Sequence, residues 1–340
     1  MLKNSYKKTI NLSIIVPIYN VEKYVHSCFE SIFSQGLDEN EFEVIIVNDG
    51  TKDKSMEMID DIIKSHSNII VINQDNQGVS VARNNGIAQA RGEYLLMPDS
   101  DDLLVDGSVK PMLEYALKNK PEMIVADYLV LNDDEILHLD NSSNIQRNEF
   151  SAIEVEGNSL LRSEFCRHHW RTMYSRKFII DNHLCFVQST SPTEDVLFSN
   201  ECFLKVKECF RTSWILNIYR KGHTSASSRY SLEKAKKMTM TIKNAWDLIK
   251  LEGLTYDTII KQRNVVFSLF REQIYAITYG HLKDAKEMIQ AIDFLKKEVP
   301  EMEFKIGYQQ KIWNIMYKRL PTPLFARIIY CLQQCRRRFS

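Results

Sequence analysis

The feature that most constrains the fold is an alternation, over the first 130 residues, of short β-rich runs with longer segments of helical periodicity. The β-rich runs are residues 12–19, 42–47, 68–73, 93–97 and 123–131. Between the first two runs, apolar residues recur at intervals of three and four, as in Val25, Cys28, Phe29 and Ile32. This alternation is typical of a mostly parallel sheet covered by helices, so the sequence predicts an α/β fold.

The composition indicates an ordered globular protein with more than one structural part. The chain has 340 residues, of which 44% are hydrophobic and 26% charged, and this length exceeds that of most single domains. Because only 11 glycines and 8 prolines occur, long helices are expected, and residues 231–299 have helical periodicity. No stretch approaches the ~18 consecutive apolar residues of a membrane-spanning helix.

The formal net charge of zero conceals a gradient along the chain. Residues 1–150 carry a net charge of −12, residues 151–304 of +4 and residues 305–340 of +8. The seven cysteines form no CxxC pair, and this odd count suits reduced thiols. Since no signal peptide is evident either, we predict a cytoplasmic protein.

The residues that directly follow the predicted strands are unusually polar. Ligands of such sheets bind beyond the carboxyl ends of the strands, where the chain carries Asn20, Asp49, Asp75 and the run Asp99-Ser-Asp-Asp102. Neither GxGxxG after the first strand nor GxxxxGK[ST] occurs, which argues against dehydrogenases and P-loop enzymes. Carboxylates repel a phosphorylated ligand unless a cation lies between them, so the run predicts a Mg²⁺ or Mn²⁺ site. Asp102 is also suited to cap a helix that begins at Leu103.

Five short motifs follow one another over residues 12–105. They are Val16-Pro-Ile-Tyr-Asn20, Val47-Asn-Asp-Gly-Thr51, Asn76-Gln-Gly-Val-Ser80, Ala82-Arg-Asn-Asn-Gly86 and Asp99-Ser-Asp-Asp102. In this order they resemble the motifs of the family 2 glycosyltransferases, and a weaker match continues to about residue 230 through Trp170, Glu194-Asp195 and Tyr219-Arg220. The resemblance implies the GT-A fold, a Rossmann-like, mostly parallel sheet flanked by helices.

The resemblance also implies a nucleotide-diphospho-sugar donor, and a UDP-sugar in particular. Asp49 would accept the imide N–H of uracil or thymine, which cytosine lacks. Arg83 would donate a charge-assisted hydrogen bond to the donor, although an arginine there also suits a surface ion pair. The residues implied in donor binding are Pro17, Tyr19, Asn20, Glu22, Asp49, Gly78, Arg83, Asp99 and Ser100.

The chemistry implied by the resemblance needs a metal and a base. Asp101, together with Asp99, would hold the divalent cation, and His223 is a further candidate for a metal ligand or a phosphate contact. Asp195 would be the base that takes the proton of the acceptor hydroxyl, while Glu194 would orient the acceptor. The turn that contains Glu194 and Asp195 also suits the N-terminus of a helix.

Acceptor binding is implied for Trp170, in the segment His168-His-Trp-Arg-Thr-Met-Tyr174. Arg171 and Thr172 stand where the family more often has Asn and Lys, so the acceptor contacts are expected to differ here. The processive branch of the family carries Gln-x-x-Arg-Trp, and residues 309–313 have Ile312 in place of that arginine. One sugar per encounter is therefore expected.

The domain organisation follows from these patterns. We expect a GT-A domain over residues 1–230, with a nucleotide-binding half at 12–130 and an acceptor half at 131–230 that opens on a polar loop at 132–149. A helical extension at 231–303 and a basic amphipathic tail at 304–340 follow. The tail suits an anchor on an anionic membrane surface, or a helix packed on the domain with a solvated basic face.

Together these features predict an inverting, metal-dependent hexosyl- or N-acetylhexosaminyltransferase of polysaccharide or surface-glycan synthesis. It would move one sugar onto a glycan acceptor, which suits a lipid-linked glycan at the inner face of the cytoplasmic membrane. A sugar nucleotidyltransferase and a non-catalytic glycan- or lipid-binding protein on the same fold are the alternatives. No nucleic-acid-binding module accompanies the basic tail, so a nucleic-acid partner is not expected.

Overall fold

The structure, a computed structural model, describes residues 10–139, 145–146, 149–162, 168–188, 193–222, 231–277, 285–300 and 315–337. The chain divides into two compact units. The first comprises residues 1–157, 168–188 and 205–223, and the second comprises residues 158–167, 189–204 and 224–340.

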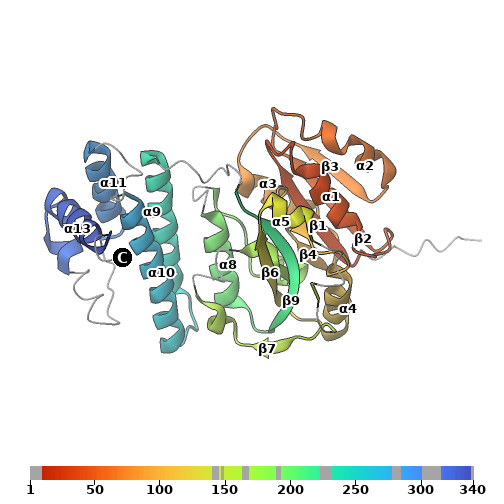
Figure 1. The fold of residues 1–340 in the computed structure, drawn as a ribbon. Coiled ribbons are helices and arrows are strands. Elements are labelled where there is room, and N and C mark those ends of the chain that lie inside the picture. The colour runs from red at the N-terminus through yellow and green to blue at the C-terminus, as the bar shows by residue number, and fades with distance from the viewer. Residues whose placement is uncertain are drawn as a thin grey trace, which may run out of the picture. The chain divides into compact units, whose positions relative to one another are not determined.

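The first unit is built on one mixed sheet with the strand order β3-β2-β1-β4-β8-β6-β9-β5, in which β7 pairs with β9 (Figure 1). Its strands are β1 (Leu12–Ile18), β2 (Phe42–Asn48), β3 (Ile69–Asn73), β4 (Tyr94–Leu96), β5 (Leu103–Leu104), β6 (Met123–Leu131), β7 (Ile153–Val155), β8 (Thr172–Ser175) and β9 (Cys209–Arg220). Strands β1 to β4 are parallel to their neighbours among these four, and β6 is parallel to β9. The predicted mostly parallel α/β sheet is therefore confirmed.

The central strands are apolar because helices cover both faces of the sheet. All seven residues of β1 are buried, as are six of the seven in β2, and parallel strands buried on both faces are continuous hydrophobic runs rather than alternating ones. Strand β8 enters the sheet antiparallel to both β4 and β6. With four residues, β8 is too short to give a periodic signal in the sequence.

The helices of the first unit connect these strands. They are α1 (Val25–Phe33), α2 (Asp60–Ser65), α3 (Val79–Gln89), α4 (Val109–Asn119), α5 (Asp133–Leu137) and α7 (Arg176–Asp181), with 3₁₀ turns at Glu57–Ile59 and His169–Arg171. Helix α5 lies in a stretch predicted to be loop. A capping box forms it, because the Asn132 side chain accepts from the Glu135 N–H while the Glu135 side chain accepts from the Asn132 N–H.

Two glycines place helix α3 against the sheet. Gly78, with φ of +90°, precedes the helix in a conformation that favours glycine. Within the helix, a Cβ atom on Gly86 would lie 2.2 Å from Cγ2 of Ile15 in β1. The absence of a side chain at Gly86 therefore allows α3, which carries Arg83, to approach β1 closely.

The second unit is helical. It contains most of α8 (Glu194–Lys205), followed by α9 (Leu232–Asp247), α10 (Tyr256–Ala276), α11 (Ala285–Glu298) and α13 (Thr322–Arg337), with 3₁₀ turns at Gly157–Leu160 and Leu248–Lys250. Helices α9, α10 and α11 run side by side (Figure 1). Gln273 of α10 is buried between them and donates to the Ala235 carbonyl (2.8 Å) and to Thr239 Oγ1 (2.7 Å). The helices predicted between residues 231 and 299 are present.

The described part of the basic tail packs its apolar face inside this unit. Tyr317, Phe325 and Ile329 are buried, and the Tyr317 ring lies 5.1 Å from that of Phe270 in α10. Lys318, Arg319 and Arg327 are exposed, whereas residues 304–314 and 338–340 lie outside the described residues. In the part of the chain that is described, no helix has the length and hydrophobicity required to cross a bilayer.

Candidate active site

Hydrogen bonds join the loop after β1 to the loop after β2. The Asn20 N–H donates to Thr51 Oγ1 (2.8 Å), and the Glu22 N–H donates to Asp53 Oδ2 (3.0 Å). Asn20 has φ of 55°, in the left-handed region that asparagine tolerates better than most residues. Pro17 is buried in β1 opposite Val47, while Tyr19 is exposed at the end of the strand. The four candidates Pro17, Tyr19, Asn20 and Glu22 thus lie along one short segment.

Asp49 organises the loop that follows β3. Its Oδ1 accepts from Gln74 Nε2 (2.8 Å) and from the Gln77 N–H (2.8 Å), and its Oδ2 accepts from the Gly78 N–H (2.9 Å). The residue is 3% exposed. Because a carboxylate offers about four acceptor positions, these three bonds leave Oδ2 able to accept one more.

Arg83 is buried beside the acidic run. Its guanidinium pairs with Asp99 (Nη2 to Oδ1, 2.6 Å) and lies 5.0 Å above the centre of the Phe186 ring. Arg83 thus forms an ion pair, as the alternative expected, but its guanidinium is buried rather than on the surface. The buried His169 lies near this arginine; burial lowers the pKa of His169 well below its usual value, and the Arg83 charge lowers it further.

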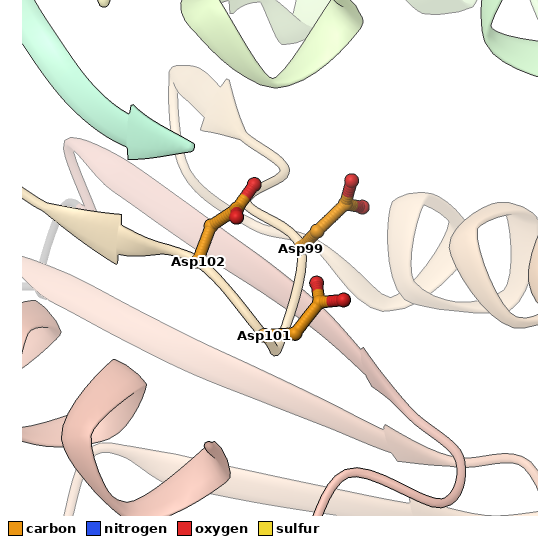
Figure 2. Close-up of side chains that lie close together, drawn as sticks. All are labelled: Asp99, Asp101 and Asp102. Atoms are coloured by element: carbon orange, nitrogen blue, oxygen red, sulfur yellow. The ribbon is translucent and has the colours of Figure 1, made fainter. Parts of the chain in front are cut away.

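Asp99, Asp101 and Asp102 extend from the short loop between β4 and β5 (Figure 2). One carboxylate oxygen of each lies within 4.8 Å of those of the other two. Asp102 is followed by strand β5, so the alternative that it caps a helix is wrong. Ser100, between the first two aspartates, is buried. The run thus concentrates three carboxylates at the edge of the sheet where β1, β2 and β4 also end.

This concentration of charge changes the protonation of its neighbours. Burial raises the pKa of Asp102 well above its usual value, and the charges of Asp99 and Asp101 raise it further. The Arg220 N–H, which donates to this carboxylate, acts in the opposite direction and lowers the pKa. Burial likewise raises the pKa of Cys28 well above its usual value, with the aspartates adding to the effect. Cys28 therefore remains a neutral thiol beneath the loop.

The three carboxylates suit a hard divalent cation. Mg²⁺ and Mn²⁺ prefer oxygen ligands, and all three side chains offer them. Asp102 Oδ2 is buried and has no hydrogen-bond partner among the described residues, a costly arrangement unless another group completes it. The residues present therefore fit a metal ion.

Three aromatic rings surround Trp170. The Trp170 ring lies 4.9 Å from Tyr128, 4.9 Å from His168 and 5.9 Å from Tyr219, which it stacks at an interplanar angle of 2°. Trp170 is only 3% exposed, whereas Tyr219 is 36% exposed. Any ligand that approaches this cluster meets Tyr219 before Trp170.

Arg171, which departs from the family pattern, is committed to internal contacts. Its side chain is buried, donates from Nε to the Ala126 carbonyl (2.5 Å), and pairs with Asp127 (Nη2 to Oδ1, 2.5 Å). Its guanidinium also lies 4.9 Å from the centre of the Tyr128 ring. Arg171 thus fixes Tyr128 within the aromatic cluster.

The motif positions agree with a comparison against protein families. Residues 13–182 match the model of glycosyl transferase family 2. The chain belongs to this family. Membership favours a glycosyltransferase over the alternatives of a sugar nucleotidyltransferase and a non-catalytic binding protein.

One relative supports this assignment. The chain is 30% identical over 227 residues to the uncharacterized glycosyltransferase EpsJ of Bacillus subtilis, a match that covers 63% of this chain and 62% of EpsJ. The chain thus spans less than two thirds of the length of EpsJ.

Two solved structures share the fold. Staphylococcus aureus TarS 1–349 in complex with UDP-GlcNAc aligns with a TM-score of 0.67 at 21% identity, over 94% of this chain and 88% of TarS. A mannosyltransferase from Pyrobaculum calidifontis, in complex with GDP-Man and Mn²⁺, aligns with a TM-score of 0.53 at 10% identity, over 94% and 87% of the two chains. The GT-A fold predicted from the family motifs is thus confirmed.

The two candidate catalytic carboxylates of this glycosyltransferase lie in the second unit. Glu194 and Asp195 form the first turn of α8, as predicted for the N-terminus of a helix. Glu194 is buried, while Asp195 is half-buried and accepts from the Val196 N–H (Oδ1, 2.8 Å). The remaining candidate, His223, lies outside the described residues.

The structure gives contacts to Asp102, Arg220, Tyr128 and Tyr219, of which only Tyr128 lies outside the motifs matched in the sequence. Asp102 belongs to the acidic run, but the sequence pattern equally suited a helix cap. Arg220 contacts Asp102 although the two are 118 residues apart, and Tyr128 meets Trp170 across two elements. No local spacing predicts such contacts, because they follow from the pairing of β9 with β5 and with β6.

Proposed function

We propose that this family 2 glycosyltransferase is metal-dependent and inverting, and that it moves one sugar from a UDP-sugar to a hydroxyl of a glycan acceptor. The observation that carries the proposal is the cluster of Asp99, Asp101 and Asp102 at the sheet edge where the strand before Asp49 also ends. The acidic cluster would hold a cation for the diphosphate, and Asp49 would bind the base.

Asp49 and its loop support a uracil-containing donor. The free position on Oδ2 accepts the imide N–H of uracil, whereas N3 of cytosine is itself an acceptor and is repelled. The proposed donor contacts come from the end of β1 and the loop after it, with Pro17, Tyr19, Asn20 and Glu22, and from the segments after β3 and β4, with Gly78, Arg83, Asp99 and Ser100. The UDP-GlcNAc complex of TarS agrees with this choice of nucleotide.

Replacing Asp49 by Asn tests the donor proposal. The amide oxygen at the Oδ1 position continues to accept from the Gln77 N–H, so the amide N–H₂ occupies the Oδ2 position that faces the base. We expect UDP binding to weaken and CDP binding to strengthen, each by about tenfold to hundredfold, because a hydrogen bond to a charged group is worth roughly 1.5–3 kcal/mol. Calorimetric titration of both nucleotides with Mn²⁺ measures the change.

The matched control is Asp75→Asn, an exposed aspartate in the same loop region, which should leave both affinities unchanged. An unchanged preference for UDP in the Asp49→Asn protein would contradict the role of Asp49 in base selection.

Asp99 and Asp101 are the proposed metal ligands, and Asp102 joins them because its oxygen lies in the same cluster. His223 is a further candidate ligand. When bound, Mn²⁺ or Mg²⁺ supplies positive charge that offsets the charge on the departing diphosphate. The Mn²⁺ complex of the Pyrobaculum mannosyltransferase supports this proposal.

The transfer proposed here is a single displacement. The acceptor oxygen forms a bond to the anomeric carbon while the bond from that carbon to the diphosphate oxygen breaks, which inverts the configuration. The hydroxyl proton moves to the Asp195 carboxylate. Glu194 orients the acceptor.

The acceptor is proposed to be a lipid-linked glycan. Around Trp170, the exposed Tyr219 ring presents an aromatic surface suited to a sugar ring, and the exposed Lys318, Arg319 and Arg327 present positive charge to an anionic membrane. The apolar face around Tyr317 and Phe325 packs inside the unit. Membrane contact through the three basic side chains would therefore be electrostatic.

A vesicle experiment tests the membrane proposal. The protein should sediment with vesicles that contain anionic phosphatidylglycerol but not with neutral phosphatidylcholine vesicles, and 0.5 M salt, on the order of three times the physiological ionic strength, should release it. Lys318→Gln with Arg319→Gln and Arg327→Gln should weaken binding, whereas Lys250→Gln, an exposed lysine paired with Asp247, should not. Equal sedimentation with neutral vesicles would contradict the proposal.

A further inference from the structure

Arg220, the last residue of β9, is buried against the acidic loop. It is only 7% exposed. Its backbone N–H donates to Asp102 Oδ1 (2.8 Å), and its side-chain Nε donates to the carbonyl oxygen of Asp101 (3.0 Å). One residue therefore contacts two of the three residues that offer oxygens to a cation.

The remaining contacts of the guanidinium fix its position from the opposite side. Nη1 forms an ion pair with Asp133 at the start of α5, and Nη2 donates to Ser27 Oγ in α1 (3.3 Å). The guanidinium also lies 5.0 Å from the centre of the Tyr24 ring. Arg220 thus connects α1, α5 and β9 to the loop that carries the aspartates.

The acidic loop requires such a support. Three carboxylates with oxygens within 4.8 Å of one another repel each other when ionised, and the loop that holds them is followed by a strand of only two residues, Leu103 and Leu104. Arg83 pairs with Asp99 on one side. On the other side, the Arg220 guanidinium holds the loop backbone through the Asp101 carbonyl, while the Asp102 carboxylate accepts from the Arg220 backbone N–H.

We infer that Arg220 is a positioning residue that holds Asp101 and Asp102 in the geometry in which they bind a divalent cation. The inference rests on the proposed function, because it presumes that the acidic cluster binds metal. Two effects of removing Arg220 have opposite signs. The loss of a nearby positive charge strengthens the attraction of the site for a cation, whereas the loss of the support disperses the ligands and weakens binding.

The sign of the change in metal affinity therefore tests the inference. We expect Arg220→Met to weaken Mn²⁺ binding by about tenfold to hundredfold, the usual effect of removing a residue that orients metal ligands. Electron paramagnetic resonance of free Mn²⁺, titrated into protein saturated with UDP, measures the affinity without any turnover. Arg220→Lys keeps the charge but loses the planar fork of donors, so it should also weaken Mn²⁺ binding, and it provides the measurement if the methionine variant does not fold.

Arg171→Met is the matched control. Arg171 is equally buried, pairs with an aspartate and lies over a tyrosine ring, so its loss should destabilise the first unit without changing Mn²⁺ affinity. Tighter or unchanged Mn²⁺ binding in both Arg220 variants would overturn the inference and leave the metal proposal intact. A wild-type protein that binds no Mn²⁺ in the presence of UDP would overturn both.

Discussion

Replacing Asp195 by Asn is expected to lower the rate of sugar transfer by about 10²- to 10⁴-fold, the usual contribution of a general base. Asparagine has nearly the same shape but cannot take up the proton of the acceptor hydroxyl. Its amide oxygen can still accept from the Val196 N–H, as Asp195 Oδ1 does now. Donor binding should therefore remain unchanged, and only the rate constant of the chemical step should fall.

The measurements separate these two quantities. Turnover of a UDP-sugar with a glycan acceptor gives kcat, and calorimetry gives the affinity for UDP. Nuclear magnetic resonance of the wild-type product reports the anomeric configuration, which should be opposite to that of the donor if the displacement is single. A product that retains the configuration would contradict the proposed role of Asp195.

The control for this variant is Asp257→Asn. Asp257 also lies in the first turn of a helix of the second unit, α10, and pairs with Lys261 (2.7 Å). Both substitutions remove a negative charge from a helix N-terminus, which is worth roughly 0.3–1 kcal/mol. If both variants lose transfer equally, the effect is one of stability, and Asp195 is not the base.

Replacing Asp101 by Ala is expected to lower turnover by about 10²- to 10³-fold. Charge stabilisation by a bound metal is worth several kcal/mol, and each 1.36 kcal/mol changes a rate tenfold. Removing one of three clustered carboxylates should weaken Mn²⁺ binding, so part of the lost rate should return at high Mn²⁺ concentration. Turnover measured against Mn²⁺ concentration distinguishes weaker metal binding from a direct loss of chemistry.

Two further measurements sharpen this prediction. A chelator should lower wild-type turnover to the level of the Asp101→Ala protein, and added Mn²⁺ should restore it. Asp106→Asn should change neither the turnover nor its dependence on Mn²⁺. Asp106 is exposed beyond β5, and its Oδ1 accepts from Ser34 Oγ (2.6 Å). Full turnover in the presence of the chelator would exclude a metal-dependent reaction.

Much of the nucleotide-binding half could be predicted because its signals are local. The five β-rich runs coincide with β1, β2, β3, β4 and β6 to within two residues at each end. For β1, β2 and β4, the reason is that buried strands in this part of the sheet are continuous apolar runs. Helix α5 was missed because a polar composition conceals a capping box, in which two side chains rather than an apolar stripe form the helix. Strand β8 has polar residues at both ends and no apolar run longer than two residues, so no local signal predicts it.

In the candidate site, too, some features follow from the local sequence and others from the tertiary structure. The sequence by itself determined that Asp49, Arg83, Asp99 and Asp101 follow strands of one sheet, because strand endings and motif spacing are local properties. Only the tertiary structure decided that Asp49 already accepts three hydrogen bonds and that Asp102 joins the acidic cluster. It also decided that Arg220 supports this cluster across 118 residues. These contacts depend on which strands pair, and pairing is set by the packing of the whole sheet rather than by any spacing along the chain.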